Sequence, residues 1–170
     1  MDQEMKAISE ELNRLLCGSG KTISSAESCT GGNIAASITA IPGSSEYFKG
    51  SIVVYSDEMK VKYLDVKQET LDKYTVYSEQ VVKEMVVGTC AAFGADYAVA
   101  TSGVAGPGGG TEDIPVGTVW IAVGTPYEIV TRKRTSDEGR MQNILSAAKE
   151  AMEMLLEFVI SKQSTETEEN

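Results

Sequence analysis

The sequence has no histidine among its 170 residues, and this absence removes most familiar hydrolytic sites. Without an imidazole the chain cannot build a Ser-His-Asp triad, a Cys-His pair or a zinc site of the H-E-x-x-H type. Any proton transfer near neutral pH must therefore use Lys, Tyr, Asp, Glu or Cys, with a pKa shifted by its surroundings.

Cysteines and long apolar runs are also scarce. The three cysteines, Cys17, Cys29 and Cys90, are odd in number, far apart and form no C-x-x-C pair. This usage is typical of reduced thiols in a cytoplasmic protein and indicates neither a disulfide framework nor a metal site. No apolar run approaches the roughly 18 residues of a membrane span, and residues 1–6 lack the apolar core of a signal peptide. We therefore expect no membrane partner.

Basic residues are outnumbered, with 15 Lys and Arg against 25 Asp and Glu and a formal net charge of −10. This balance repels nucleic acid, although a local basic pocket can still take a small phosphate. Apolar residues make up 42% and charged residues 24% of the chain, which are ordinary globular values. We expect one domain over residues 1–162 and a disordered acidic tail over residues 163–170.

Helical and extended segments alternate along the chain. Apolar spacing and capping predict a helix near residues 5–16, three helices at about 31–41, after 56 or 57, and at 78–93, and a clear last helix from about residue 137. Strands are predicted at 22–26, 51–55, 96–101, 117–123 and 127–134. This order predicts a three-layer α/β/α sandwich whose sheet is mostly parallel, with an antiparallel strand from the late hairpin.

The first segment that could carry chemistry is Ala26-Glu27-Ser28-Cys29-Thr30-Gly31-Gly32. Ser28, Thr30, Gly31 and Gly32 would present hydroxyls and backbone N–H groups at the start of a helix, which suits a phosphate or a carboxylate. The alternative is ordinary capping by Thr30, and the pattern alone favours it.

The second segment pairs Pro42-Gly43-Ser44-Ser45 with the stretch from Tyr55 to Lys60. Without histidine, a nucleophilic serine needs a desolvated lysine or an ionised tyrosine as its base. Lys60 falls in the first turn of a predicted helix, where the helix dipole lowers the pKa of an amine. In the alternative interpretation, Lys60 extends to solvent and Tyr55 ends an ordinary strand.

The third segment is the glycine-rich stretch 103–110, which includes Gly103, Gly106 and Gly108. It lacks the Gly-Lys-Ser/Thr ending of a P-loop, and no G-x-G-x-x-G follows the first strand, so neither nucleotide-hydrolysis nor dehydrogenase motifs are present. So much glycine beside a strand suggests backbone close to a ligand. Arg140, near the start of the last helix, is a candidate anion partner or else a solvated surface arginine.

These segments together resemble one known family. The matching motifs are Ala26–Gly32, Pro42–Ser45, Tyr55–Lys60, Gly103–Pro107 and Pro115–Trp120, within a similarity that runs from about residue 5 to 159. In these motifs the chain resembles the C-terminal domain of the competence- and damage-inducible protein CinA, the nicotinamide mononucleotide amidase family.

The resemblance implies a mixed five-stranded sheet, hydrolysis of the carboxamide of nicotinamide mononucleotide, no metal or other cofactor, and a homo-oligomer. It implies a catalytic set of Ser45, Tyr55 and Lys60, with Ser28 as a competing nucleophile and Ser44 beside the substrate. Two alternatives remain open. The chain could be a non-catalytic nucleotide-binding or protein-interaction module of the same fold, or an amidase for a different pyridine or nucleotide amide.

Overall fold

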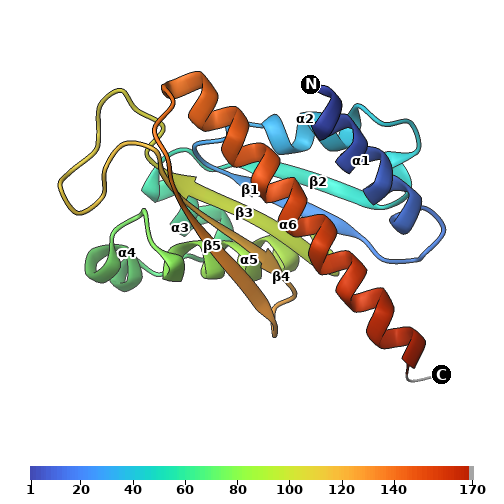
Figure 1. Ribbon diagram of the computed structural model, residues 1–170. Coiled ribbons are helices and arrows are strands. Elements are labelled where there is room, and N and C mark those ends of the chain that lie inside the picture. The colour runs from blue at the N-terminus through green and yellow to red at the C-terminus, as the bar shows by residue number, and fades with distance from the viewer. Residues whose placement is uncertain (169–170) are drawn as a thin grey trace.

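The computed structural model describes the backbone of residues 1–168 and the side chains of residues 1–165. Figure 1 shows helices packed on both sides of one twisted sheet. The helices are α1 (Gln3–Leu16), α2 (Asn33–Thr39), the 3-10 helix η1 (Ser44–Glu46), α3 (Asp57–Leu64), α4 (Gln68–Tyr74), α5 (Glu79–Phe93) and α6 (Arg140–Glu168). The strands are β1 (Ile23–Glu27), β2 (Phe48–Val53), β3 (Tyr97–Gly103), β4 (Thr118–Gly124) and β5 (Ile129–Thr135).

The five strands form one mixed sheet in the order β2-β1-β3-β4-β5. Strand β1 pairs in parallel with both β2 and β3, whereas β4 runs antiparallel to its neighbours β3 and β5. The predicted class, an α/β sandwich with a mostly parallel sheet and an antiparallel strand from the late hairpin, is confirmed. The carboxyl ends of β1, β2 and β3 therefore lie along one edge of the sheet, where α/β proteins commonly bind ligands.

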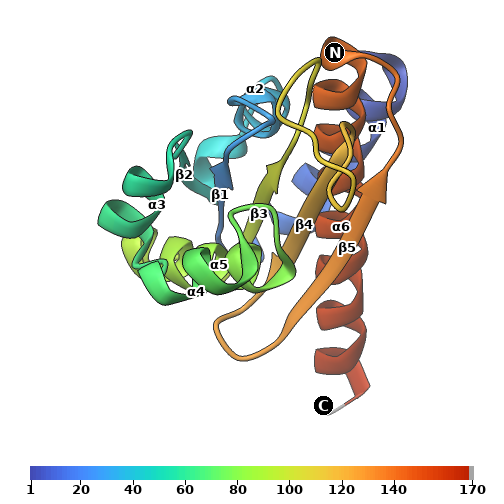
Figure 2. The same cartoon turned by 90° about the vertical axis from the view of Figure 1, so that its left-hand side faces the viewer.

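Helices cover both faces of the sheet, as the side view in Figure 2 shows. On one face α1, α2 and α6 enclose a core with Ile23, Val99 and Ile121 of the sheet. On the other face α3, α4 and α5 pack over small sheet residues such as Ala98 and Ala100. Because successive strand residues point to opposite faces, the alternation of Ala98, Val99 and Ala100 in β3 supplies both cores at once.

One local feature departs from its apolar pattern. The run Ile52-Val53-Val54 is typical of a buried strand, but β2 is an edge strand, and the Val53 side chain is 48% exposed although Val54 is buried. Helix α6 extends to Glu168, into the stretch 163–170 for which a disordered tail is predicted, and the last two residues lie outside the described part of the chain.

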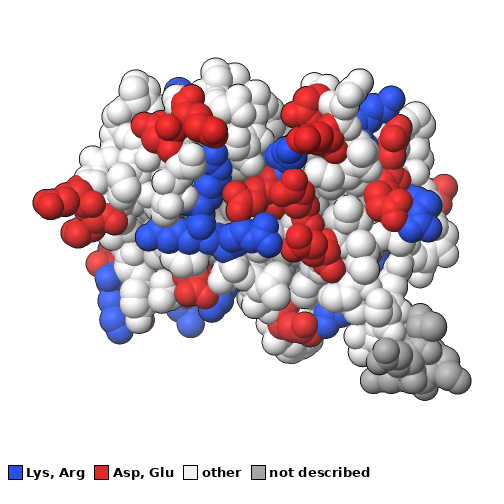
Figure 3. Space-filling model, viewed as in Figure 1, with Lys and Arg blue, Asp and Glu red and all other residues white. Residues whose placement is uncertain are grey.

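Charges of both signs are mixed on the face drawn in Figure 3, over β5 and α6. Arg132 pairs with Glu150 and Glu157, and Arg134 pairs with Glu138 and Glu150. The pairs with Glu150 and Glu157 connect the last strand to the last helix. Among the described residues, no helix combines the length and the apolar character needed to cross a bilayer.

Candidate active site

A cavity of about 200 Å³ opens at the carboxyl edge of the parallel strands. Five separate stretches of chain line it, namely the ends of β1, β2 and β3 with the segments that follow, the connection between α4 and α5, and the start of α6. The lining residues are Ser28, Cys29, Tyr55, Asp57, Lys60, Val76, Tyr77, Gly103, Val104, Ala105, Gly106, Gly108, Gly109 and Arg140.

Ser28 and Lys60 meet at this cavity. Ser28 follows the last residue of β1, and its backbone N–H donates to the carbonyl of Thr101 in β3. The Lys60 Nζ donates to Ser28 Oγ at 3.2 Å and to the Val54 carbonyl at 2.9 Å. The serine hydroxyl and the lysine amine are therefore within direct proton-transfer distance.

Burial sets the protonation of Lys60. Its side chain is 0% exposed, and desolvation lowers its pKa from the usual 10.5, although the nearby Asp57 carboxylate opposes the shift. Removal from water disfavours the ammonium form, so the neutral amine is easier to reach than in an ordinary lysine. The sequence anticipated a lowered pKa from desolvation and from the helix dipole, and burial is the largest cause here.

Tyr55 and Arg140 form the outer part of the cavity. The Arg140 guanidinium donates through Nη1 to the Gly106 carbonyl at 2.6 Å and through Nη2 to the Tyr55 hydroxyl at 3.1 Å. Gly106 has a φ of +84°, and a Cβ there would lie 2.4 Å from the Val116 side chain, so only glycine fits this turn. The loop and the arginine are thus held together at the mouth.

The expected anion site at Thr30, Gly31 and Gly32 is already filled by the protein itself. The fully buried Glu27 carboxylate accepts hydrogen bonds from the N–H groups of Gly32 at 2.9 Å, Ile34 at 3.1 Å and Ala35 at 2.9 Å. It also accepts from the Thr30 hydroxyl at 2.7 Å. The start of α2 therefore has an internal counter-ion, and these three residues do not line the cavity.

The structure does not bring Ser45 together with Tyr55 and Lys60. Ser44 and Ser45 form η1 before β2 begins, whereas Tyr55 follows the end of that strand. A strand of this length separates its two ends by about 20 Å. Figure 1 shows the segment before β2 on the right and the loop after β3 on the left. Ser45 is exposed and lies outside the cavity. The expected catalytic set of Ser45, Tyr55 and Lys60 is therefore not assembled in this structure.

Of the two serines between which the sequence left the choice open, Ser28 is the one beside the lysine. Gly103, Gly106, Gly108 and Arg140 line the cavity, and their contact with a substrate stays a prediction.

Sequence reasoning missed Asp57 and the segment Val76-Tyr77, which also line the cavity. Nothing in the local sequence marks Val76 and Tyr77, because they reach the cavity only through the packing of α5 on the sheet. Cys29 is the other reactive side chain in the lining, and burial raises the pKa of its thiol to about 12. Such a thiol stays protonated and is a poor nucleophile.

The fold and cavity define an α/β protein with a serine–lysine pair at the carboxyl edge of its parallel strands. The family model for the CinA C-terminal domain matches residues 5–159. The chain therefore belongs to the CinA C-terminal domain family.

Named relatives support this membership. The chain is 47% identical over 133 residues to the nicotinamide-nucleotide amidohydrolase PncC of Escherichia coli K12, across 78% of this chain and 81% of the relative. It is 55% identical over 120 residues to a CinA-like protein of Shewanella piezotolerans, across 71% of this chain but only 28% of that longer protein. The crystal structure of competence/damage inducible protein CihA from Agrobacterium tumefaciens has a TM-score of 0.89 at 33% identity, covering 92% of this chain and 96% of that one.

Proposed function

We propose that this chain hydrolyses the carboxamide of nicotinamide mononucleotide to nicotinic acid mononucleotide and ammonia. The observation that carries the proposal is the hydrogen bond between Ser28 Oγ and the buried Lys60 Nζ at the cavity. The similarity to PncC, whose name states a nicotinamide-nucleotide amidohydrolase activity, supplies the substrate.

In this mechanism the neutral Lys60 amine takes the proton of Ser28 as Oγ attacks the carboxamide carbon. The tetrahedral intermediate carries negative charge on the former carbonyl oxygen, and backbone N–H groups of the glycine-rich segment after β3 stabilise it. Gly103, Gly106 and Gly108 line the cavity and allow this close approach of backbone.

Collapse of the intermediate breaks the carbon–nitrogen bond. The Lys60 ammonium returns its proton to the leaving nitrogen, which departs as ammonia, and a serine ester remains. A water molecule then attacks the ester, again losing its proton to Lys60, which passes it to the departing Ser28 oxygen. The product acid is released, and serine and amine return to their starting states.

Arg140 receives the 5′-phosphate in this proposal. Its guanidinium stands at the mouth of the cavity and can offer two parallel N–H donors to a phosphate. Tyr55 accepts a hydrogen bond from Arg140 and keeps the guanidinium oriented. The homo-oligomer and the cytoplasmic location stay predictions.

The test is turnover of nicotinamide mononucleotide by the purified chain, followed as ammonia release and as nicotinic acid mononucleotide by chromatography. Ser28→Ala removes the nucleophile and should lower kcat at least about a thousandfold. Ser45→Ala is the matched control, because this exposed serine lies at the opposite end of β2, and it should retain wild-type turnover. Equal losses in both variants, or no turnover by the wild-type chain, would overturn the proposal.

A further inference from the structure

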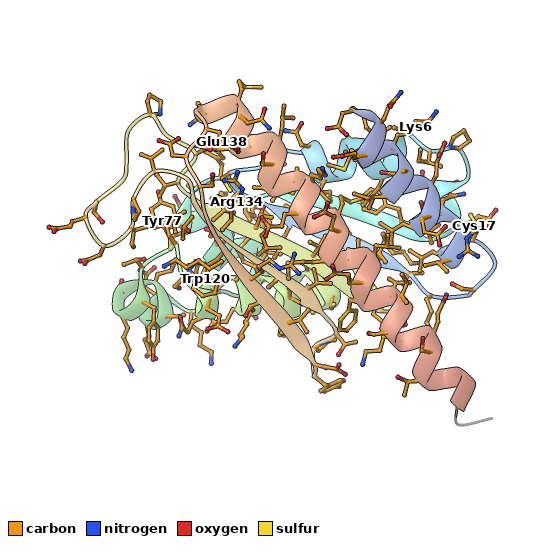
Figure 4. All side chains as sticks on the ribbon, in the orientation of Figure 1. Lys6, Cys17, Tyr77, Trp120, Arg134 and Glu138 are labelled. Atoms are coloured by element: carbon orange, nitrogen blue, oxygen red, sulfur yellow. The ribbon has the colours of Figure 1, made fainter. Side chains whose placement is uncertain are left out.

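Tyr77 lines the same cavity from a segment that takes no part in the proposed chemistry. It lies in the connection between α4 and α5, and Figure 4 shows it on the side of the molecule where the loop after β3 lies. Its ring is half-buried, and burial is the largest cause of the raised pKa of its hydroxyl, ahead of the Asp57 and Tyr55 charges. Within the part of the chain that the structure describes, that hydroxyl makes no hydrogen bond.

The backbone that presents Tyr77 is held in an unusual conformation. Thr75 has φ +66° and ψ 163°, a region that is almost restricted to glycine, and a β-branched residue there costs on the order of 1–3 kcal/mol. Strain of this kind persists only where neighbouring contacts enforce it, and it concentrates at binding sites.

Two contacts enforce it here. The Ser102 hydroxyl at the end of β3 donates to the Val76 carbonyl at 2.9 Å. On the other side, the Ser78 hydroxyl donates to the Thr75 carbonyl at 2.8 Å and caps the first turn of α5. Tyr77 is therefore fixed between the sheet and a helix start.

The position matches a requirement of the substrate. In a nicotinamide nucleotide the carboxamide is bonded directly to the pyridine ring, so attack by Ser28 brings that ring into the cavity beside the reacting carbon. Tyr55 and Tyr77 are the aromatic side chains of the lining, and the Tyr55 hydroxyl is engaged by Arg140. Aromatic rings stack in offset or edge-to-face geometry, and tyrosine faces also attract a cationic ring.

We propose that the ring of Tyr77 is the wall against which the pyridine ring of the substrate stacks, and that it selects aromatic amides for this site. This inference rests on the proposed function for the identity of the substrate. It assigns Tyr77 to ground-state binding of the ring and gives it no part in proton transfer.

The test measures binding without turnover. Calorimetric titration of the Ser28→Ala protein with nicotinamide mononucleotide and with ribose 5-phosphate gives two dissociation constants, and only the first ligand carries the ring. Adding Tyr77→Leu should raise the constant for nicotinamide mononucleotide about tenfold and that for ribose 5-phosphate less than about twofold. Tyr77→Phe keeps the ring and should leave both constants within about twofold.

Tyr127→Leu is the matched control, because Tyr127 is 97% exposed at the turn between β4 and β5, and it should change neither constant. The inference is overturned if Tyr77→Leu weakens the binding of both ligands equally, or if Tyr77→Phe loses as much affinity as Tyr77→Leu. It is also overturned if nicotinamide mononucleotide does not bind. If the wild-type chain fails to hydrolyse the nucleotide while the ring-specific loss is observed, the proposed activity fails and the ring subsite stands.

Discussion

Lys60 Nζ lies 3.2 Å from Ser28 Oγ, although 32 positions separate the two residues in the chain. Ser28 follows β1 and Lys60 lies in α3, so the contact depends on β2 returning the chain beside β1. In the proposed mechanism this pair supplies a nucleophile and a base in a protein that has no histidine.

The amidase rate should rise with pH as Lys60 loses its proton. Burial lowers the pKa of this amine below 10.5, so the active neutral form gains population as the pH climbs through that lowered value. The measurement is kcat/KM for nicotinamide mononucleotide from acidic pH up to pH 10.5. Lys60→Arg should be inactive at every pH, since a guanidinium does not deprotonate, and a flat wild-type profile up to pH 10.5 would contradict the assignment.

The same lowered pKa links folding to pH. The unfolded chain binds the Lys60 proton more tightly than the folded one, so the free energy of unfolding rises with pH between the lowered pKa and 10.5. Urea unfolding of wild type and Lys60→Met at several pH values gives the slope of the unfolding free energy against pH. The part of that slope due to Lys60 should be absent in the variant. A slope that is identical in the two proteins would show that Lys60 does not contribute to it.

Glu27→Gln should destabilise the fold by about 3 kcal/mol, because a buried carboxylate that accepts three backbone N–H groups becomes an amide with an unsuitable donor. Urea unfolding gives the value. Glu58→Gln, an exposed glutamate in the first turn of α3, is the control and should stay within about 0.5 kcal/mol. A loss below about 1 kcal/mol for Glu27→Gln would mean that α2 is held by other contacts.

Thr75→Gly should stabilise the chain by about 1 kcal/mol, since relief of the strained φ and ψ exceeds the entropy cost of the added glycine. Asp65→Gly is the comparison, because Asp65 has φ 58° and ψ 25° in the left-handed region that aspartate tolerates, and its gain should be smaller. Thermal unfolding of both variants shows which substitution stabilises the chain more. A destabilised Thr75→Gly would show that the conformation is not strained.

Arg140→Ala should raise the KM for nicotinamide mononucleotide by about 10- to 100-fold by removing a charge-assisted contact to its phosphate. Inhibition by free nicotinamide, which has no phosphate, should change much less. Arg132→Ala is the control, because Arg132 pairs with Glu150 and Glu157 between β5 and α6. The kcat and KM of this variant should remain unchanged. If inhibition by nicotinamide weakened to the same extent, Arg140 would support the cavity and would not contact the phosphate.

The spacing of apolar residues was sufficient to predict the elements that bury a continuous apolar face. Met5, Leu12 and Leu16 repeat at helical spacing and are buried in α1, as predicted. Strand β2 was harder to locate, because it begins at Phe48 and passes through Lys49 and Gly50, which look like a turn. An edge strand needs only one covered face, so its sequence carries a weaker apolar signal.

The sequence identified most residues of the candidate site but did not show which of them lie together. Tyr55, Lys60 and Arg140 were identified from residue type and motif, and all three line the cavity. Which serine lies beside Lys60 depends on the strand end that each serine occupies, and the parallel pairing of β1 with β2 places Ser28 there.

The role of Glu27 was invisible to local patterns. Its carboxylate caps a helix that begins several residues later, whereas the sequence offered Thr30 as the cap or the turn as an anion site.

Arg140 opens the last helix, 85 positions after the tyrosine whose hydroxyl it contacts. A growing polypeptide therefore cannot complete the cavity mouth until α6 has left the ribosome and packed on the sheet. Binding of the proposed nucleotide is therefore expected only after α6 has been made and has packed, so a chain truncated before Arg140 would be unable to retain it.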